Sequence, residues 1–484
     1  MKATLQVLPI LSVFLLASCG GSGGGGGSTT PPPSPPPESD SPGGIWLGTL
    51  TSSVLNQVEE IVGVITETGQ ARFVSLDGGQ QFFGQISMDG DTASGTLRAV
   101  SLVGGEFADG SSSGNINIEA TVSERNTIEG TFVGVGDEGT FSVAFDTLYD
   151  LDSSLLAVQG HWTAPESIFK ILVPGFGSAP LGARVDAFGG IDAADLDGCD
   201  YSGSVGILDA QFNVYSVTLV VSSCAAWDGQ YSGFGVFDNS TEPTDALLIA
   251  VATNEVSIVG LLAEAAAESA SGLWSGTIQS TLTGNHETLG MISEEGDAQF
   301  FSLTGSQITG SVEVFGNIVR MSTTAYAPFG TTHPDGSVSG SVDVRGLVTT
   351  AFRSSGTFVG VGDSGIYDIF YSTDYERTSS LSRVQGLWST PSPTGGSGDL
   401  IISVASTGEF SGSSDGCSYS GLIGLIDSTF NLYRVDADIA NCAGITGQYS
   451  GLGTLSDEQS PNDTLVVSVN NEVTSLWALF SRVP

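Results

Sequence analysis

The chain has 484 residues, of which 53 are acidic and 13 are basic, so its formal net charge is −40. This balance argues against nucleic acid as a partner, because phosphate binding needs basic patches. With 67 glycines, 40% hydrophobic and 14% charged residues, the composition is typical of an all-β protein and not of a disordered acidic tail.

The first residues have the pattern of an exported lipoprotein. Lys2 gives a positive start, and residues 5–16 form an apolar run that is too short to span a bilayer comfortably. The run ends in Leu16-Ala17-Ser18-Cys19, which resembles the bacterial lipobox. That resemblance implies a signal peptide at 1–18 and a mature N-terminus at Cys19 that carries acyl chains such as palmitate. An ordinary signal peptide with a chance cysteine is the alternative.

A tether is expected after the cysteine, at residues 19–42. It opens as GGSGGGGGSTT, a flexible coil, and continues as PPPSPPPESDSP, a semi-rigid polyproline spacer. Gly20 follows the cysteine where an aspartate would indicate retention in the inner membrane, so the outer membrane is the expected destination. Both the surface and the periplasmic face remain open.

The rest of the chain is a duplication. TFVGVGD at 131–137 recurs at 357–363, and GQYSGFG at 229–235 recurs as GQYSGLG at 447–453. Each repeat is itself divided in two, because a Gly-x-Trp motif occurs four times in the chain at nearly equal spacing. The tryptophans of these motifs are Trp46, Trp162, Trp274 and Trp388. We therefore expect unit A at 43–157, unit B at 158–264, a linker at 265–271, unit A′ at 272–383 and unit B′ at 384–484.

Each unit is predicted to be an antiparallel β-barrel. Short runs rich in β-branched and aromatic residues alternate with turn signals such as Asp89-Gly90 and Asp335-Gly336. The Gly-x-Trp start resembles that of lipocalin-like barrels, in which the indole plugs the closed end and an arginine of the last strand stacks on it. Arg482 is a candidate for that arginine in B′. One helical-looking stretch, Leu261 to Ala270, is interpreted as a linker helix or an extended strand end. The fold class is thus all-β, with two homologous lobes of two barrels each.

Four cysteines follow Cys19, in two pairs that are each 25 residues apart: Cys199 with Cys224, and Cys417 with Cys442. Turn sequences lie at the midpoints of both pairs, so the cysteines should face each other across a β-hairpin and form disulfides. An oxidising envelope compartment agrees with this. A metal site would need nearby histidines or paired C-x-x-C spacing, and the sequence has neither.

Several stretches match motifs for catalysis or cofactor binding, but their surroundings favour turns and hairpins. Gly134 to Gly139 reads G-x-G-x-x-G, but a strand-like Thr-Phe-Ser-Val follows, so we expect a glycine-rich hairpin and no dinucleotide site. The G-x-S-x-G patterns at 110–114 and 412–416 lie in polar turns. None of the three histidines, His161, His286 and His333, recurs between the repeats. We therefore expect no enzyme, cofactor or metal, with structural calcium near Asp89 or Asp195 kept as an alternative.

The favoured function is a membrane-anchored, non-catalytic binding or presentation module at the cell envelope. The anchor, the tether and the two-lobe plan resemble Gram-negative surface lipoproteins such as transferrin-binding protein B and factor H binding protein, whose barrel lobes bind a host protein. A lipocalin-like carrier of a small apolar ligand is the second hypothesis, and a degenerate envelope hydrolase is the third.

Overall fold

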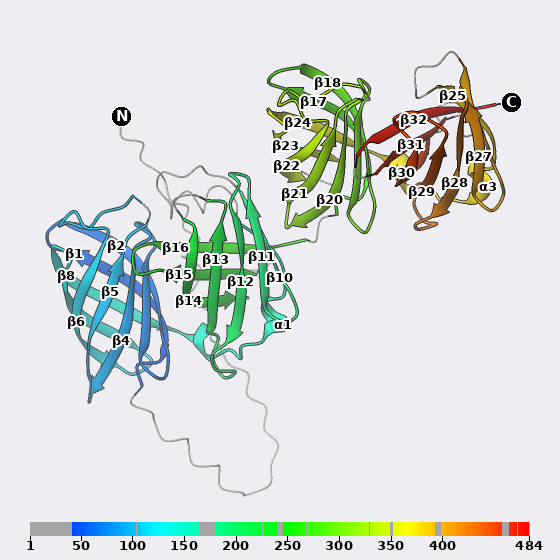
Figure 1. The fold of residues 1–484 in the computed structure, drawn as a ribbon. Helices are drawn as coiled ribbons and strands as arrows, with labels where there is room; N and C mark the ends of the chain where they lie inside the picture. Colours follow the sequence, from blue (N-terminus) through cyan, green and yellow to red (C-terminus); the bar gives the residue numbers. More distant parts are fainter. Residues whose placement is uncertain are drawn as a thin grey trace, which may run out of the picture. The chain divides into compact units, whose positions relative to one another are not determined.

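The structure is a computed structural model, and it describes residues 41–102, 104–164, 180–224, 227–239, 245–266, 269–328, 330–348, 352–392, 398–456, 464–471 and 473–483. The predicted signal peptide, Cys19 and nearly all of the tether lie outside the described residues. The described chain forms four closed, eight-stranded antiparallel barrels, called A, B, A′ and B′ here (Figure 1). The predicted all-β fold of two lobes, each with two barrels, is confirmed.

The first lobe contains barrels A and B. The strands of A are β1 Gly44–Ser52, β2 Gln57–Ile65, β3 Gln70–Ser75, β4 Gln81–Asp89, β5 Thr92–Val100, β6 Ser113–Ser123, β7 Thr127–Gly134 and β8 Asp137–Asp146. The strands of B are β9 Gly160–Ala164, β10 Leu181–Val185, β11 Gly190–Asp195, β12 Asp200–Ile207, β13 Tyr215–Ser222, β14 Gly229–Asp238, β15 Ala246–Ala252 and β16 Ser257–Ala265.

The second lobe contains barrels A′ and B′. The strands of A′ are β17 Gly272–Ser280, β18 Gly284–Ile292, β19 Asp297–Ser302, β20 Gln307–Phe315, β21 Ile318–Tyr326, β22 Ser339–Val348, β23 Arg353–Gly360 and β24 Asp363–Ser372. The strands of B′ are β25 Gly386–Pro391, β26 Asp399–Val404, β27 Glu409–Ser414, β28 Cys417–Leu425, β29 Tyr433–Ala440, β30 Gly447–Ser456, β31 Thr464–Asn470 and β32 Ser475–Arg482.

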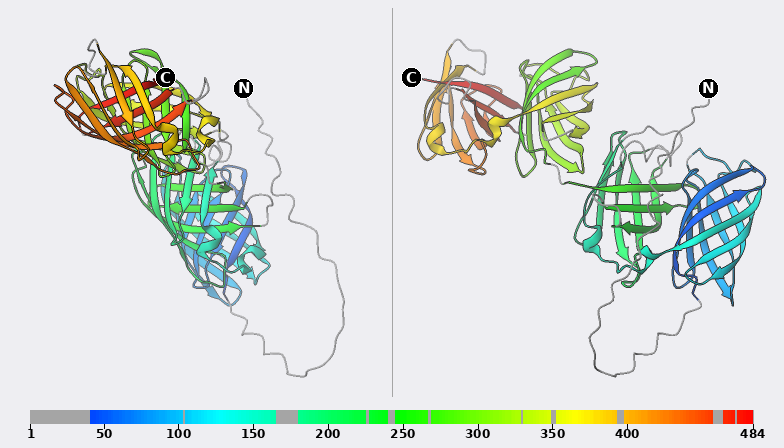
Figure 2. Two further views of the ribbon diagram at one scale, coloured as in Figure 1. Left: turned by 90° about the vertical axis from the view of Figure 1, so that its right-hand side faces the viewer. Right: turned by 180° about the vertical axis from the view of Figure 1, so that it is seen from behind.

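Every barrel is an up-and-down meander closed by its first and last strands. Figure 2 draws the same ribbon from two further sides. In A, β1 pairs with both β2 and β8, and in B′ the closing pair brings Trp388 opposite Arg482. Closure matters because a closed barrel has no free strand edge to which another chain could add a strand. The two-residue turn Val135-Gly136 closes β7 onto β8, so the G-x-G-x-x-G stretch is the expected hairpin.

Alternation along the strands fills each barrel with apolar side chains. In β13, YSVTLVVS, the buried positions are Tyr215, Val217, Leu219 and Val221, and the residues between them face outward. This is the pattern of period two that the β geometry requires of a sheet with one buried face. Each of the four barrels has its own apolar cluster of this kind.

Short helical turns join the two barrels of each lobe, at positions that the sequence did not predict. A 3-10 turn η1 Thr147–Asp150 and an α-turn α1 Leu155–Val158 connect A to B, and η2 Thr373–Glu376 with α3 Leu381–Val384 repeats them between A′ and B′. Of the helical-looking stretch 261–270, residues 261–265 are the end of β16, which is the second of the two interpretations. No helix among the described residues is long and apolar enough to cross a membrane.

Candidate functional site

The four tryptophans of the Gly-x-Trp motifs are buried at the starts of their barrels, each at most 3% exposed. Each indole Nε1 donates to the backbone carbonyl four residues earlier: Pro42, Val158, Ala270 and Val384, at 3.1, 3.0, 3.0 and 2.8 Å. The repeated bond satisfies the one polar atom of the indole, as burial of a tryptophan demands. In B′ the guanidinium of Arg482 lies 4.2 Å from the ring centroid of Trp388.

Both predicted disulfides are present, Cys199–Cys224 and Cys417–Cys442. Their expected placement, directly opposite in the hairpin ladder, is wrong by one residue. The β12–β13 ladder ends with Asp200 opposite Ser222, and the β28–β29 ladder ends with Ser418 opposite Ala440. A residue with positive φ, Ser223 or Asn441, then turns the chain so that the second cysteine can reach the first. The bridges therefore close the ends of the hairpins and do not cross their strands.

His286 and His161 lie apart, and each makes a structural contact, within A′ for His286 and between B and A′ for His161. The Nε2 atom of His286 lies 2.8 Å from the hydroxyl oxygen of Thr283, and the Nδ1 atom of His161 accepts from the backbone of Gly316 at 3.4 Å. The stretch 412–416 runs from β27 into a turn toward β28, without the strand–turn–helix setting of a nucleophile elbow. Within the described ranges, no group of three His, Cys, Asp or Glu side chains is arranged to hold a metal ion.

The barrel interiors are closely packed. Inside A′ there is a cavity of about 30 Å³ among residues such as Phe300, Phe358 and Tyr367, and inside B′ one of about 70 Å³ among residues such as Tyr419, Trp477 and Phe480. Burial raises the pKa of Tyr367 to about 12, so this phenol stays neutral. Pockets that hold drug-sized ligands measure about 300–1,000 Å³. The interiors of A′ and B′ therefore leave little room, and the outer faces become the relevant surfaces.

Within each lobe the two barrels pack through a repeated aromatic contact. Tyr149 stacks on Phe212 in the first lobe, and Tyr375 stacks on Phe430 in the second. Nearby, the buried amide of Gln81 donates to Val251, Ser257 and Ile258 of barrel B, and in the second lobe Gln307 accepts from Ser468 and Ser475 of B′. Fully satisfied buried amides of this kind fix one relative position of the packed surfaces.

Barrels B and A′ meet through the β20–β21 hairpin of A′. Phe315 and Ile318 at its tip are fully buried, in one apolar cluster with Ala194 of B. The carbonyl of Phe315 approaches Gly182 so closely that a Cβ there would lie 1.8 Å from the oxygen. Gly182 is therefore required for this contact. In barrel A the corresponding hairpin tip is Asp89-Gly90-Asp91-Thr92, a polar turn.

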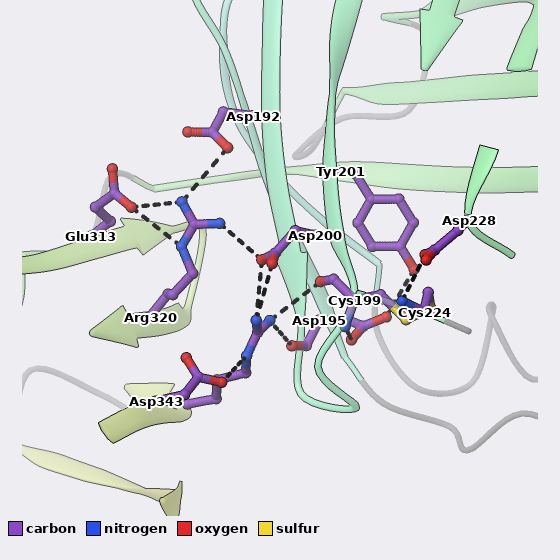
Figure 3. Close-up of polar contacts among 11 residues, drawn as sticks. Asp192, Asp195, Cys199, Asp200, Tyr201, Cys224, Asp228, Glu313, Arg320 and Asp343 are labelled. Atoms are coloured by element: carbon purple, nitrogen blue, oxygen red, sulfur yellow. Dashed lines mark hydrogen bonds and ion pairs between the residues drawn. A yellow bond between two sulfur atoms is a disulfide. The ribbon is translucent and has the colours of Figure 1, made fainter. Parts of the chain in front are cut away.

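An ion cluster surrounds this contact (Figure 3). Arg320 lies 2.9 Å from Asp200 and 2.6 Å from Glu313, and Arg345 lies 3.2 Å from Asp200 and 3.0 Å from Asp343. Arg345 also donates to two backbone carbonyls of B, those of Asp195 and Cys199, both at 3.3 Å. The bonds satisfy a guanidinium that is almost completely buried.

Asp195 lies under the same cluster, where it accepts from the hydroxyl of Tyr201 at 2.8 Å and from the backbone of Cys199 at 2.9 Å. Burial raises the pKa of Asp195, and these two hydrogen bonds only partly oppose the effect. Burial likewise raises the pKa of Asp192 and of Tyr201. Both carboxylate oxygens of Asp195 therefore already accept hydrogen bonds from the protein, which does not favour the alternative of a calcium site there.

The charges of this cluster occur only in the barrels that meet. Strand register places Ser94 and Glu119 of A where A′ has Arg320 and Arg345. It places Ile401, Ser411 and Ser418 of B′ where B has Gly182, Asp192 and Asp200. The sequence analysis missed these residues because it searched for what the repeats share. The positions at which the repeats differ in charge, and the few arginines of the chain, would have indicated these residues.

Eleven of the 13 basic residues lie in the described ranges, and six of these contact a neighbouring barrel: Arg72, Arg98, Arg320, Arg345, Arg377 and Arg434. Arg72 is more buried than Arg98 and Arg320. Burial lowers the pKa of Arg72 to about 10, so its guanidinium remains charged at neutral pH. Much of the positive charge is therefore held between barrels, and the outer surface is left predominantly acidic.

No protein-family profile and no curated protein matches the chain. The solved structures that are similar to it include the two that follow. One is a candidate outer membrane protein from Bacteroides fragilis NCTC 9343, with 12% identity and a TM-score of 0.17, over 68% of this chain and 97% of that one. The other is a mutant of the vaccine antigen transferrin-binding protein B from Haemophilus parasuis, with 7% identity and a TM-score of 0.17, over 75% of this chain and 84% of that one. The second belongs to the protein class that the sequence resembles, although at these scores neither likeness carries an argument about function.

Proposed function

We propose that the chain is a lipid-anchored protein of the bacterial cell envelope that acts as a non-catalytic binding or presentation module. In this proposal, Cys19 carries the acyl chains, residues 19–42 are the tether, and the two lobes display their outer faces to a protein partner. Several acyl chains give durable anchoring, because each buried methylene contributes about 0.8 kcal/mol.

One observation carries this proposal. The barrels are closed and filled with apolar side chains, so a partner can be recognised only through outward side chains and loops. The repeated packing within each lobe, and the B–A′ ion cluster, give those outer faces a defined setting. A scaffold of this kind is better suited to binding a partner on its outer surface than to catalysis in a cleft.

The carrier alternative gains no support from the cavities. Even the one in B′, at about 70 Å³, is smaller than the 150 Å³ apolar cavity that admits benzene in an engineered protein. A lipid or a drug-sized ligand would need several side chains such as Tyr419 and Phe480 to leave their positions.

Protease shaving of intact cells tests the proposal. Cells that express the full chain are labelled with palmitate and treated with protease, before or after permeabilisation. We expect label on the wild type and none on Cys19→Ala, and we expect loss of the protein from intact cells. Digestion only after permeabilisation would overturn surface presentation, and equal labelling of both forms would overturn the anchor.

A further inference from the structure

The outer surface of barrel A′ carries exposed apolar residues on two adjacent strands, β23 and β24. Val359, Ile366 and Phe370 are each between 50% and 62% exposed. Their neighbours Phe358, Tyr367 and Ile369 line the barrel interior, so the residues between them on the two strands point outward. We call these three exposed residues the β23–β24 face.

Strand register makes this face continuous. Phe370 lies opposite Arg353, and Ile366 lies opposite Thr357, two residues from Val359. Between the two apolar ends, Arg353 and Asp368 form an ion pair at 2.7 Å, and the guanidinium lies 5.7 Å from the ring centroid of Phe370. The pair neutralises itself, so the centre of the face has no net charge.

Barrel A shows that the fold does not require these residues. At the corresponding exposed positions it carries Val133, Thr140 and Ala144, and it pairs its strands β7 and β8 in the same register. It also has Glu129 and Glu138 where A′ has Ser355 and Ser364. Barrel A′ thus has a phenylalanine and an isoleucine where A has alanine and threonine, and it lacks two of the negative charges of A, in a chain of net charge −40.

The surroundings of the face are acidic. Glu287 lies outward on β18, opposite Thr277, which in turn lies opposite Asp368. At the β23–β24 turn, the exposed Asp335 lies against Gly362. An apolar centre with a charged rim is the usual anatomy of a protein–protein contact, where the centre provides most of the binding energy and the rim provides selection.

From this pattern we propose that the β23–β24 face is the docking site for a foreign protein whose own contact surface has an apolar centre and a basic rim. The proposal rests on the proposed function and names its surface. Because A′ is closed, the partner cannot add a strand and must bind through side chains. A second copy of this chain fits poorly, since it would bring another acidic rim and has few basic residues outside its barrel contacts. An anionic membrane surface would be repelled in the same way.

Site-specific photo-crosslinking in intact cells tests the face. The full chain carries p-benzoylphenylalanine at Phe370 in one strain, at the matched Ala144 in a second, and at the exposed Phe188 of barrel B in a third. We expect an adduct with a different protein from the Phe370 strain only. Adducts from Phe188 or Ala144 but not from Phe370 would overturn the face and leave the binding module standing. A Phe370 adduct with the mass of two copies of this chain would show self-association and overturn the proposal as well. The absence of any adduct from the Phe370 strain would likewise overturn it.

The crosslinked protein is then purified and its affinity measured against three forms of the full chain. Ile366→Thr with Phe370→Ala installs the residues of barrel A, which the fold accommodates there, and should weaken binding at least tenfold with an unchanged melting temperature. Thr140→Ile with Ala144→Phe in barrel A is the matched control and should leave the affinity unchanged. Affinity should also fall as NaCl rises from 50 to 500 mM. Binding that neither the A′ exchange nor salt weakens would refute the proposal.

Discussion

Tyr375 stacks on Phe430 across the boundary between A′ and B′, with ring centroids 4.7 Å apart and ring planes 12° from parallel. Tyr149 and Phe212 repeat the contact between A and B at 4.6 Å and 17°. In both lobes the tyrosine hydroxyl donates to a glutamate of its own barrel, Glu294 or Glu67, at 2.9 Å. The pair of barrels is therefore the unit that was duplicated, and this aromatic stack with its glutamate is repeated in both lobes.

Removing one ring of this stack should destabilise its lobe. We expect Phe430→Ala to lower the free energy of unfolding by about 2 kcal/mol, since the ring is half-buried and fully buried phenylalanines cost about 3–5 kcal/mol when truncated. Phe212→Ala should behave alike. Phe188→Ala, at an 89% exposed position, is the control and should cost less than about 0.5 kcal/mol. Urea unfolding followed by tryptophan fluorescence provides the measurement, and a Phe430→Ala chain as stable as the control would contradict the expectation.

The disulfides should matter to a similar degree in both B-type barrels. Replacing Cys199 and Cys224 with serine should lower stability by about 3 kcal/mol, because each bridge closes a loop of 25 residues and restricts the unfolded chain. The corresponding change at Cys417 and Cys442 should match it. Reductant should destabilise the wild type and leave a variant that lacks all four cysteines unaffected. A reductant effect on that variant would show that something other than these bridges responds.

The sequence predicted the β class, the four barrels and the cysteine pairing because these follow from residues that recur, such as Trp46 with Trp274 and Cys199 with Cys417. It did not predict the contacts between barrels. Phe315 and Ile318 look like ordinary strand ends until barrel B is seen to cover them, and Gly182 looks like any other strand glycine. Such contacts depend on surfaces that lie far apart in the chain, and no local pattern marks them.

The B–A′ ion cluster offers a double-mutant test of that junction. Arg345→Ala and Asp200→Ser, alone and together, should show a coupling free energy of about 1–2 kcal/mol, since Arg345 is buried and Asp200 is only 28% exposed. Serine is the residue that B′ carries at the position of Asp200. The exposed pair Arg353–Asp368 is the matched control and should couple more weakly, because water screens exposed ion pairs. Equal coupling in both pairs, or coupling at Arg345 that 0.5 M NaCl abolishes, would mean that the junction is not the buried contact described above.

The pH dependence of stability follows from carboxyl groups whose pKa burial raises. Asp195, Asp192 and Asp146 all belong to this group. A carboxyl with a raised pKa binds its proton more tightly in the folded chain than in the unfolded one. Its stabilising contribution is therefore complete below the unfolded pKa near 3.9 and is lost as pH rises through the raised folded pKa.

Repulsion among the 53 acidic residues changes stability in the same direction, so we expect the melting temperature to be higher at pH 5 than at pH 7. Asp195→Asn separates the two causes. It removes the buried carboxyl, and an amide can still pair with Tyr201, so the variant should gain stability at pH 7 and lose part of the difference between pH 5 and pH 7. Asp197→Asn, at the exposed position two residues on, removes the same formal charge and should keep that difference. If both variants give the same melting curve at each pH, overall charge and not the burial of Asp195 sets the response.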